Sequence, residues 1–210
     1  MDIVIFGAAG ATGREIVAQA LEQGHRITAF IRNPSWSGRD QLNLKVMCGD
    51  VRDAGAVAAA IEGQDAVVCA LGAATPLRRD PGLVDGIGNI VTAMERHGVR
   101  RLVYLSFLGV HDGRPQLSRL GRRVVAPVLM RNVVADHEDK ERIIRSSSLD
   151  WVIVRPPRLT NGPRRGTYRC GAGIRAAAMV PRISRSDVAD FLLRQIHDDT
   201  YVRQTPAVMY

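Results

Sequence analysis

The chain has 210 residues, of which 46% are hydrophobic and 24% charged, and its formal net charge is +8. This length suits one domain with a single sizeable core, and no apolar run is long enough to span a bilayer. The first residues lack the basic stretch of a secretory signal peptide. The three cysteines are scattered without Cys-x-x-Cys spacing, so we expect no disulfide framework, no metal site and a reducing, cytoplasmic environment. We interpret Cys48 and Cys69, which lie in apolar runs, as core residues.

The basic residues are all arginines except Lys45 and Lys140. A positive net charge is typical of nucleic-acid-binding proteins. Here, however, the arginines are spread along the chain, and no aromatic residues interleave with them as a stacking platform requires. A basic pocket for an anionic ligand explains the same charge. We therefore expect neither a nucleic-acid nor a membrane partner.

Short runs rich in Val, Ile and Leu alternate with segments of helical periodicity along the chain. In chain order, we expect strand 2–6, helix 12–23, strand 26–31, strand 44–48, helix 54–62, strand 65–71, helix 82–97, strand 101–106, helix 133–147, strand 150–155 and helix 186–196, the last capped by Ser186. Apolar strands separated by helices indicate a parallel sheet covered on both faces, which is a doubly wound α/β fold. Ligands of such folds bind at the carboxyl ends of the strands, near the point where the strand order reverses.

A glycine-rich stretch, "GAAGATG", follows the first strand and opens the first helix. Gly7 permits a tight turn, Gly10 lets the backbone approach a pyrophosphate, and Gly13 lets the helix pack closely on the strand. The helix N-terminus, which includes Ala11, offers N–H groups and a positive dipole end to phosphates, and Thr12 adds a hydroxyl donor. This context favours a dinucleotide-binding loop over an ordinary strand–helix turn.

The end of the second strand distinguishes NAD from NADP, because an acid there binds the ribose 2′-hydroxyl whereas an arginine accommodates the 2′-phosphate. Arg32 lies 19 residues past the last glycine of the loop, and no Asp or Glu occurs from 26 to 38. Asn33, Ser35 and Arg39 are nearby polar residues that could assist. We therefore predict NADP(H) as the cofactor, against the alternative that Arg32 is a solvated loop residue.

The third and fourth strands end in "CGDV" and "ALGA". Asp50 and Val51 are placed to contact the edge and face of an adenine, although Asp50 could instead be a helix cap. Gly72, which follows Ala70 and Leu71, would allow the backbone to pass close to the cofactor.

Five segments together resemble a known family: "GAAGATG", "GDVRD", "DAVVCALG", "GIGNIVTAMERHGVRRLVYLS" and "DWVIVRPPRL". They are similar to atypical short-chain dehydrogenase/reductases of the NAD(P)H-binding, NmrA-like type, and most of all to the biliverdin reductase B branch, also called flavin reductase (NADPH). The resemblance covers almost the whole chain. It implies one NAD(P)-binding Rossmann domain over 1–210, with a small substrate-side portion at about 111–135 and 156–185. It also implies a monomer.

The resemblance departs from the wider superfamily where most members carry Tyr-x-x-x-Lys. Aligned with that motif, Val133 takes the Tyr position and His137 the Lys position, and none of the four tyrosines precedes a lysine by four. We expect Lys140 to point away from the face of His137, because three residues is just under one turn. The resemblance implies that His137 faces the nicotinamide ribose. Carbonyl reduction with a tyrosine proton donor is therefore not expected.

Ser106, at the end of the fifth strand, matches the active-site serine of the family. It could hydrogen-bond the nicotinamide carboxamide or an acceptor, or simply cap the strand end. It lacks the G-x-S-x-G elbow of a nucleophile. By the same resemblance, Pro156 and Pro157 would form a rigid wall near the nicotinamide. Arg158 departs from the biliverdin reductase B branch, which has a histidine there; with Leu159 it could bind an anionic acceptor, and this difference leaves the substrate open.

The resemblance thus implies an NADPH-dependent reductase that transfers hydride to a flavin or a similar flat, anionic acceptor, such as a tetrapyrrole or a quinone-like molecule. Ser106 and His137 would be its catalytic residues. The arginine-rich segment 111–130 would form a lid over the acceptor, unless it is a solvated basic loop. Two alternatives stay open: a non-catalytic NADP(H)-sensing regulator of NmrA type, and a reductase or isomerase of another small metabolite.

Overall fold

The computed structural model describes the whole chain except residues 34–40, 73–79, 111–130, 176–177 and 179. At 131 and 133 it describes the main chain but not the side chain. The central sheet has six strands, which are β1 (Asp2–Phe6), β2 (Arg26–Ile31), β3 (Leu44–Cys48), β4 (Ala66–Cys69), β5 (Arg101–Leu105) and β6 (Asp150–Val154). Their order is β3-β2-β1-β4-β5-β6, and every neighbouring pair is parallel. The order reverses between β1 and β4, so the predicted doubly wound α/β fold is confirmed.

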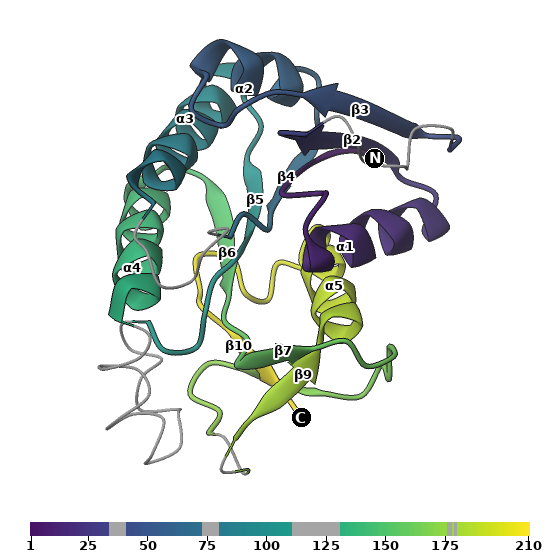
Figure 1. Cartoon of the computed structure of the whole chain (residues 1–210), viewed down its shortest axis with the longest axis vertical. Helices are drawn as coiled ribbons and strands as arrows, with labels where there is room; N and C mark the ends of the chain where they lie inside the picture. Colours follow the sequence, from purple (N-terminus) through teal and green to yellow (C-terminus); the bar gives the residue numbers. More distant parts are fainter. Residues whose placement is uncertain (34–40, 73–79, 111–130, 176–177, 179) are drawn as a thin grey trace.

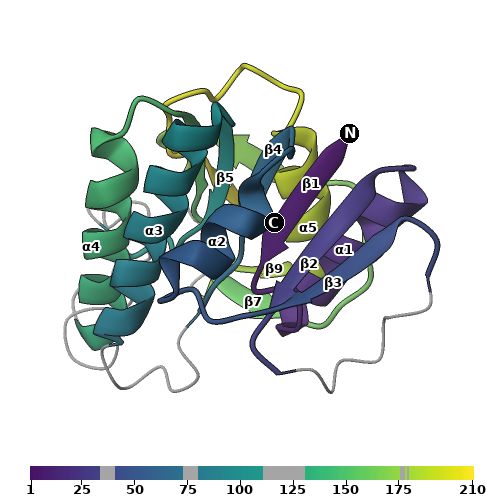
Figure 2. The same ribbon diagram turned by 90° about the horizontal axis from the view of Figure 1, so that it is seen from above.

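Helices cover both faces of this sheet (Figures 1 and 2). One face carries α1 (Ala11–Glu22) and α5 (Arg185–Arg194), and the other carries α2 (Ala54–Ile61), α3 (Pro81–His97) and α4 (Arg131–Ser146). The two layers explain why the strands are apolar almost without interruption, because a strand that is covered on both faces has no side exposed to water.

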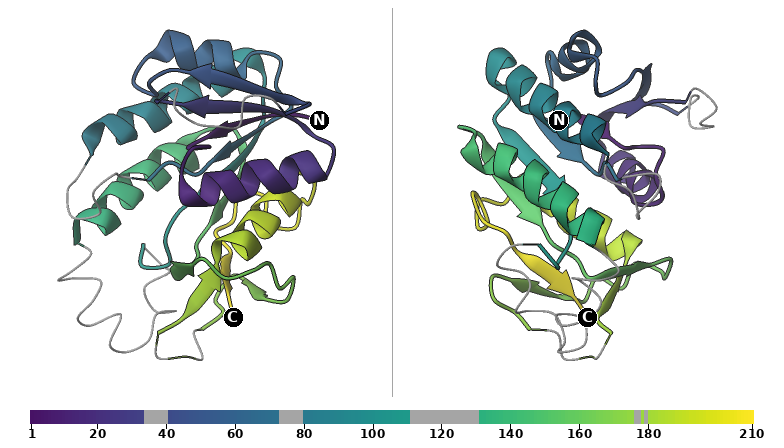
Figure 3. Two further views of the ribbon diagram at one scale, coloured as in Figure 1. Left: turned by 45° about the vertical axis from the view of Figure 1, so that its right-hand side comes forward. Right: turned by 60° about the vertical axis from the view of Figure 1, so that its left-hand side comes forward.

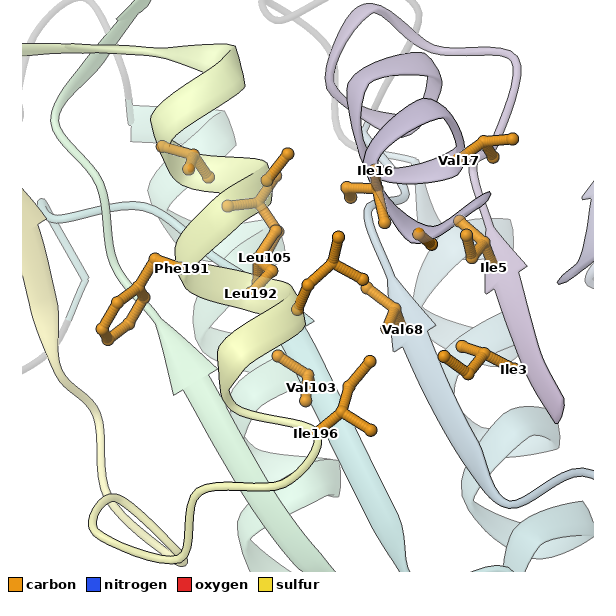
Figure 4. Packing of buried hydrophobic residues seen from close by; sticks show 14 of the residues in the cluster. Ile3, Ile5, Ile16, Val17, Val68, Val103, Leu105, Phe191, Leu192 and Ile196 are labelled. Carbon is orange, nitrogen blue, oxygen red and sulfur yellow. The ribbon is translucent and has the colours of Figure 1, made fainter. Parts of the chain in front are cut away.

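Alternate residues of each strand divide the core into two clusters. Figure 4 shows Ile16 of α1 beside Ile5 of β1, and Leu192 of α5 beside Leu105 and Val103 of β5, all in one cluster. The alternate residues Val4 and Phe6 belong to the opposite cluster, under α2 and α3. These clusters hold the carboxyl ends of the strands in fixed positions.

A smaller region lies beyond the carboxyl ends of β5 and β6 (Figure 3). It contains two short sheets, in which β7 (Arg158–Thr160) pairs with β9 (Arg182–Ser184) and β8 (Arg169–Gly171) pairs with β10 (Ala207–Met209). We call residues 156–184 with 205–210 the C-terminal lobe. None of the helices in the described part of the chain is both long and apolar enough to cross a membrane.

Two sequence predictions are wrong at this level. Ser184, not Ser186, caps α5: its Oγ accepts a hydrogen bond from Asp187 N at 3.0 Å, while Ser186 Oγ accepts one from Gln19 on α1. Cys48 is exposed because β3 is the edge strand, with a neighbour on one side only; Cys69, in the interior strand β4, is buried as predicted.

Candidate functional site

The turn from β1 to α1 contains two glycines, Gly7 and Gly13, that leave no room for a Cβ atom. Gly7 has φ +83°, and a Cβ atom on it would lie 2.6 Å from the Ala70 carbonyl oxygen. A Cβ atom on Gly13 would lie 2.0 Å from the Gly7 carbonyl oxygen. Gly10 forms the N-cap of α1 without any side-chain cap. The helix therefore presents bare N–H groups and its positive dipole end, as a phosphate site requires.

A cleft of about 250 Å³ lies at the carboxyl ends of β1 to β4, beside the point where the strand order reverses. Seven of the predicted cofactor residues line it: Gly7, Gly10, Arg32, Asp50, Val51, Leu71 and Gly72. The sequence did not single out the other lining residues, which are Ala9, Phe30, Ile31, Gly49, Arg52, Asp80, Gly82 and Leu83. Residues from four strand ends and from the start of α3 thus meet at one place.

Two arginines and one aspartate set the charge at the β2–β3 end of the cleft. Arg52 Nε and Nη2 donate to the two carboxylate oxygens of Asp50, at 3.0 and 2.5 Å. Hydrogen bonds from the Arg52 side chain and backbone lower the pKa of Asp50 to about 2. Asp53, not Asp50, caps α2, so the alternative reading of Asp50 as a helix cap is wrong.

Arg32 forms no salt bridge within the described part of the chain, and its charge stays available to an anion.

Ser106 is fixed by a buried ion pair beneath the ends of β5 and β6. Its Oγ donates to Glu141 Oε1 at 2.6 Å, and Arg155 donates to both oxygens of that carboxylate at 3.0 and 2.6 Å. Glu141 is fully buried and Arg155 is 1% exposed. The Ser106 hydroxyl donates its hydrogen to Glu141, so the lone pairs of its oxygen can still accept a hydrogen bond from a carboxamide. The hydroxyl bonds this carboxylate and does not act as a simple strand-end cap.

His137 lies against a tyrosine that the sequence did not connect with it. The Tyr104 hydroxyl and His137 Nδ1 are 3.0 Å apart. Burial raises the pKa of Tyr104 well above its usual value, so the hydroxyl stays protonated. Burial and the charge of Lys140 lower the pKa of His137 to about 3. At neutral pH the pair is uncharged, and Nε2 is the remaining ring nitrogen of His137.

Lys140 corrects one expectation from the sequence. Its side chain is 1% exposed and acts on the charge of His137, so it does not point away from it; residues three apart on a helix share a face. Burial lowers the pKa of Lys140, against the charges of Asp136, Cys69 and Asp80. Asp136 Oδ2 accepts a hydrogen bond from Asp80 N at 3.0 Å. This contact joins α4, beside His137, to the α3 end that lines the cleft.

The other predicted site residues lie around this frame. Thr12 is buried in the first turn of α1, next to the exposed Ala11, and Asn33 is exposed just after β2. Ala70 follows β4 with its carbonyl against Gly7. Both prolines after β6 are buried, and Pro156 O accepts a hydrogen bond from Leu108 N at 3.0 Å.

The two predicted acceptor residues begin β7, Arg158 with an exposed side chain and Leu159 half-buried. Ser35, Arg39, the segment 111–130 and the side chain of Val133 lie outside the described residues. Their predicted roles therefore stay predictions.

Several residues of the site were missed because their importance depends on distant partners. Glu141 carried a weak signal, since it lies four residues after His137 and so on the same helical face. Asp80 followed by Pro81 is a common helix start, and it would have placed the beginning of α3 at the cleft. Nothing near Tyr104 or Arg155 in the sequence indicates a polar network.

The fold and the glycine turn define a Rossmann protein with a nicotinamide dinucleotide site. The sequence matches the model of the NAD(P)H-binding family over residues 7–199, and the chain belongs to that family. The predicted membership of the atypical, NmrA-like short-chain dehydrogenase/reductases is thereby supported, and NAD(P)H is the cofactor class. The prediction of an NAD(P)H-binding protein is confirmed.

Known proteins resemble different lengths of this chain. An uncharacterized chloroplastic protein of Arabidopsis thaliana is 29% identical over 78% of the chain, which spans 61% of that relative. A putative exported protein from Burkholderia pseudomallei superposes with a TM-score of 0.81, at 28% identity and full coverage of both chains. ChuY, an anaerobilin reductase from Escherichia coli O157:H7, superposes with a TM-score of 0.80 at 22% identity, covering 99% of this chain and 96% of its own. The last likeness shows the fold alone.

Proposed function

We propose that the chain is an NADPH-dependent reductase that delivers hydride to a flat conjugated acceptor, such as a flavin or a tetrapyrrole, without a Tyr-x-x-x-Lys dyad. One observation carries this proposal: His137, at the Lys position of the dyad, is neutral, and Tyr104, the tyrosine that contacts it, is fully buried with a raised pKa. Neither is suited to protonate a carbonyl at neutral pH. Bound NADPH would supply the hydride, and reduction of a flavin needs little acid catalysis from the protein.

The residues present fit the cofactor in three places. The glycine turn would take the pyrophosphate, since Gly7 and Gly13 let β1 and α1 pack closely and the uncapped N-terminus of α1 offers its N–H groups. Arg32 would hold the 2′-phosphate and Val51 would cover the adenine. The Ser106 oxygen, oriented by Glu141, would accept from the carboxamide. These residues bind and orient, which is the protein's share of such a reaction.

The acceptor class is supported by charge and by one structural neighbour. Arg158 brings a cation to the strand that follows β6, and ChuY, whose fold is the same, is described as a reductase of anaerobilin. The test is NADPH oxidation at 340 nm with riboflavin, FMN, dichlorophenolindophenol and biliverdin. Turnover with at least one acceptor is expected. Tight NADPH binding with no turnover on any of them would contradict the proposal and favour an NADP(H)-sensing regulator.

Replacing Arg32 by alanine is expected to weaken NADPH binding by about tenfold or more, because the 2′-phosphate loses a charge-assisted hydrogen bond. NADH, which lacks that phosphate, should bind the variant and the wild type alike. Titration calorimetry with both cofactors measures the two affinities. Arg14→Ala, at an exposed position of α1 outside the cleft lining, serves as the charge-matched control. An unchanged NADPH/NADH preference in Arg32→Ala would show that Arg32 is only a solvated loop residue.

A further inference from the structure

A second cavity, distinct from the cofactor cleft, lies in the C-terminal lobe. Its volume is about 460 Å³, and it is lined by Arg158, Arg165, Ala178, Val180, Arg182 and Tyr210. The residues come from β7, from the segment after it, from β9 and from the end of the chain. No acidic residue is among them. Three guanidinium groups therefore share one concave surface.

The arginines of this cavity differ from others in the described residues in how their side chains are paired. Within the described part of the chain, none of the three forms a salt bridge. Arginines elsewhere in the molecule do, as Arg100 does with Asp150 and Arg194 with Asp190. Like charges gathered without counter-charges repel one another, so such a cluster is stabilised when an anion enters it.

The cavity is built on a rigid support. Asp187, fully buried at the start of α5, accepts hydrogen bonds from Arg165 N at 2.8 Å, Ser184 Oγ at 3.0 Å and Tyr210 Oη at 2.5 Å. Burial alone would raise the pKa of Asp187, but these hydrogen bonds outweigh it and lower the pKa. The Arg165 guanidinium stacks over the Tyr210 ring, 4.5 Å from its centroid. The positions of one cation and one aromatic ring are thus fixed before any ligand binds.

The cavity also has apolar walls, and along the chain it lies close to the ion pair that holds Ser106. Val180 is 57% exposed although it is aliphatic, and it lies with Tyr210 in the cavity lining. Arg155 holds Glu141, and Arg158 comes three residues later in the chain. The Cα atoms of Arg155 and Arg158 are therefore at most about 11 Å apart. A flat ring with an anionic arm matches this mixture of apolar surface and positive charge.

We propose that this three-arginine cavity is the subsite for the anionic arm of the acceptor, a phosphate or a carboxylate, and that it makes the enzyme selective for anionic acceptors over neutral ones. The proposal rests on the proposed reductase function. Guanidinium groups bind both oxyanions in bidentate fashion, so the shared chemistry is an oxyanion next to a conjugated ring.

The test compares acceptors that differ only in the anionic group. FMN and riboflavin share one ring system and differ by a phosphate; biliverdin and its dimethyl ester differ by two carboxylates. We expect the wild type to favour FMN over riboflavin in kcat/KM by about tenfold or more, as expected for a charge-assisted hydrogen bond. Arg182→Gln and the double variant Arg158→Gln/Arg182→Gln should bring that ratio close to one. Arg175→Gln removes the same charge from an exposed site of the lobe outside the cavity and should keep the ratio.

The two tetrapyrrole substrates separate the sources of the oxyanion. A larger ratio for the biliverdin pair than for the flavin pair identifies carboxylate as the preferred group, and the reverse identifies phosphate. Equal kcat/KM for both members of each pair, unchanged in Arg182→Gln, would overturn the subsite and leave the reductase function standing.

A binding measurement tests the subsite separately from the reductase function. FMN binding is followed by quenching of flavin fluorescence in the presence of saturating NADP⁺, where no hydride is available. If no acceptor turns over but Arg182→Gln still weakens FMN binding by about tenfold, the reductase function fails and the anion subsite stands. If FMN binding is the same in the wild type and in both cavity variants, the subsite is rejected independently of activity.

Discussion

Gly13→Ala is expected to remove most of the NADPH affinity and to destabilise the protein. The new Cβ atom would lie 2.0 Å from the Gly7 carbonyl oxygen and 2.8 Å from Ala8 Cα. Both are main-chain atoms, so the clash is relieved only if α1 moves away from β1. Overpacking of this kind costs about 1–3 kcal/mol. The same movement carries the helix N-terminus away from the pyrophosphate, and we expect NADPH affinity to fall by about a hundredfold.

Urea unfolding of the cofactor-free protein measures the first effect and titration calorimetry with NADPH the second. Gly88→Ala is the matched control, because a Cβ atom on Gly88, inside α3, would meet nothing within 4 Å. That substitution should be neutral, or stabilise by up to about 1 kcal/mol through helix propensity. A Gly13→Ala variant with wild-type affinity and stability would show that the β1–α1 turn is more compliant than this packing implies.

Arg155→Met is expected to cost about 3–5 kcal/mol of stability, which corresponds to a fall in Tm of roughly 10 °C. Methionine fills similar space but leaves the Glu141 carboxylate, which is fully buried, without its bidentate partner. Thermal unfolding followed by circular dichroism measures the loss. Arg142→Met, on the outer face of α4, removes an exposed pair with Asp139 and should cost less than about 1 kcal/mol.

The double variant Glu141→Leu/Arg155→Met separates packing from orientation. Replacing both charges by apolar groups is expected to recover most of the lost stability. The Ser106 hydroxyl then has no acceptor to orient it, so the KM for NADPH should rise and kcat should fall although the protein is folded. Recovery of both stability and kinetics would mean that the ion pair is structural only.

The strand and helix pattern was largely predictable from the sequence because it depends on local periodicity. The expected strands 26–31 and 44–48 have those bounds in the structure, and most other ends differ by one or two residues. The four short strands of the C-terminal lobe were missed. Strands of three residues carry too little alternation to recognise, and β7 finds its partner β9 more than twenty residues later.

In the candidate site, too, the residues that depend on local spacing were predictable and those that depend on distant partners were not. Gly7, Gly10 and Arg32 could be found because a phosphate loop and a strand-end cation act from fixed spacings in one segment. The partners of Ser106 and His137 could not, because Glu141 and Tyr104 are more than thirty residues away from them. Proximity of that kind is created by the pairing of β5 with β6 and the packing of α4.

The sequence by itself determined the fold class, the cofactor class and the place of the phosphate loop, since each follows from local spacing and hydrophobic pattern. Tertiary structure alone decided the protonation of His137, which burial beside Lys140 holds neutral. It also decided which arginines stay unpaired. The sequence singled out Arg158 alone, and only the packing of the C-terminal lobe brings it to one cavity with Arg165 and Arg182, none of which has a salt-bridge partner in the described residues.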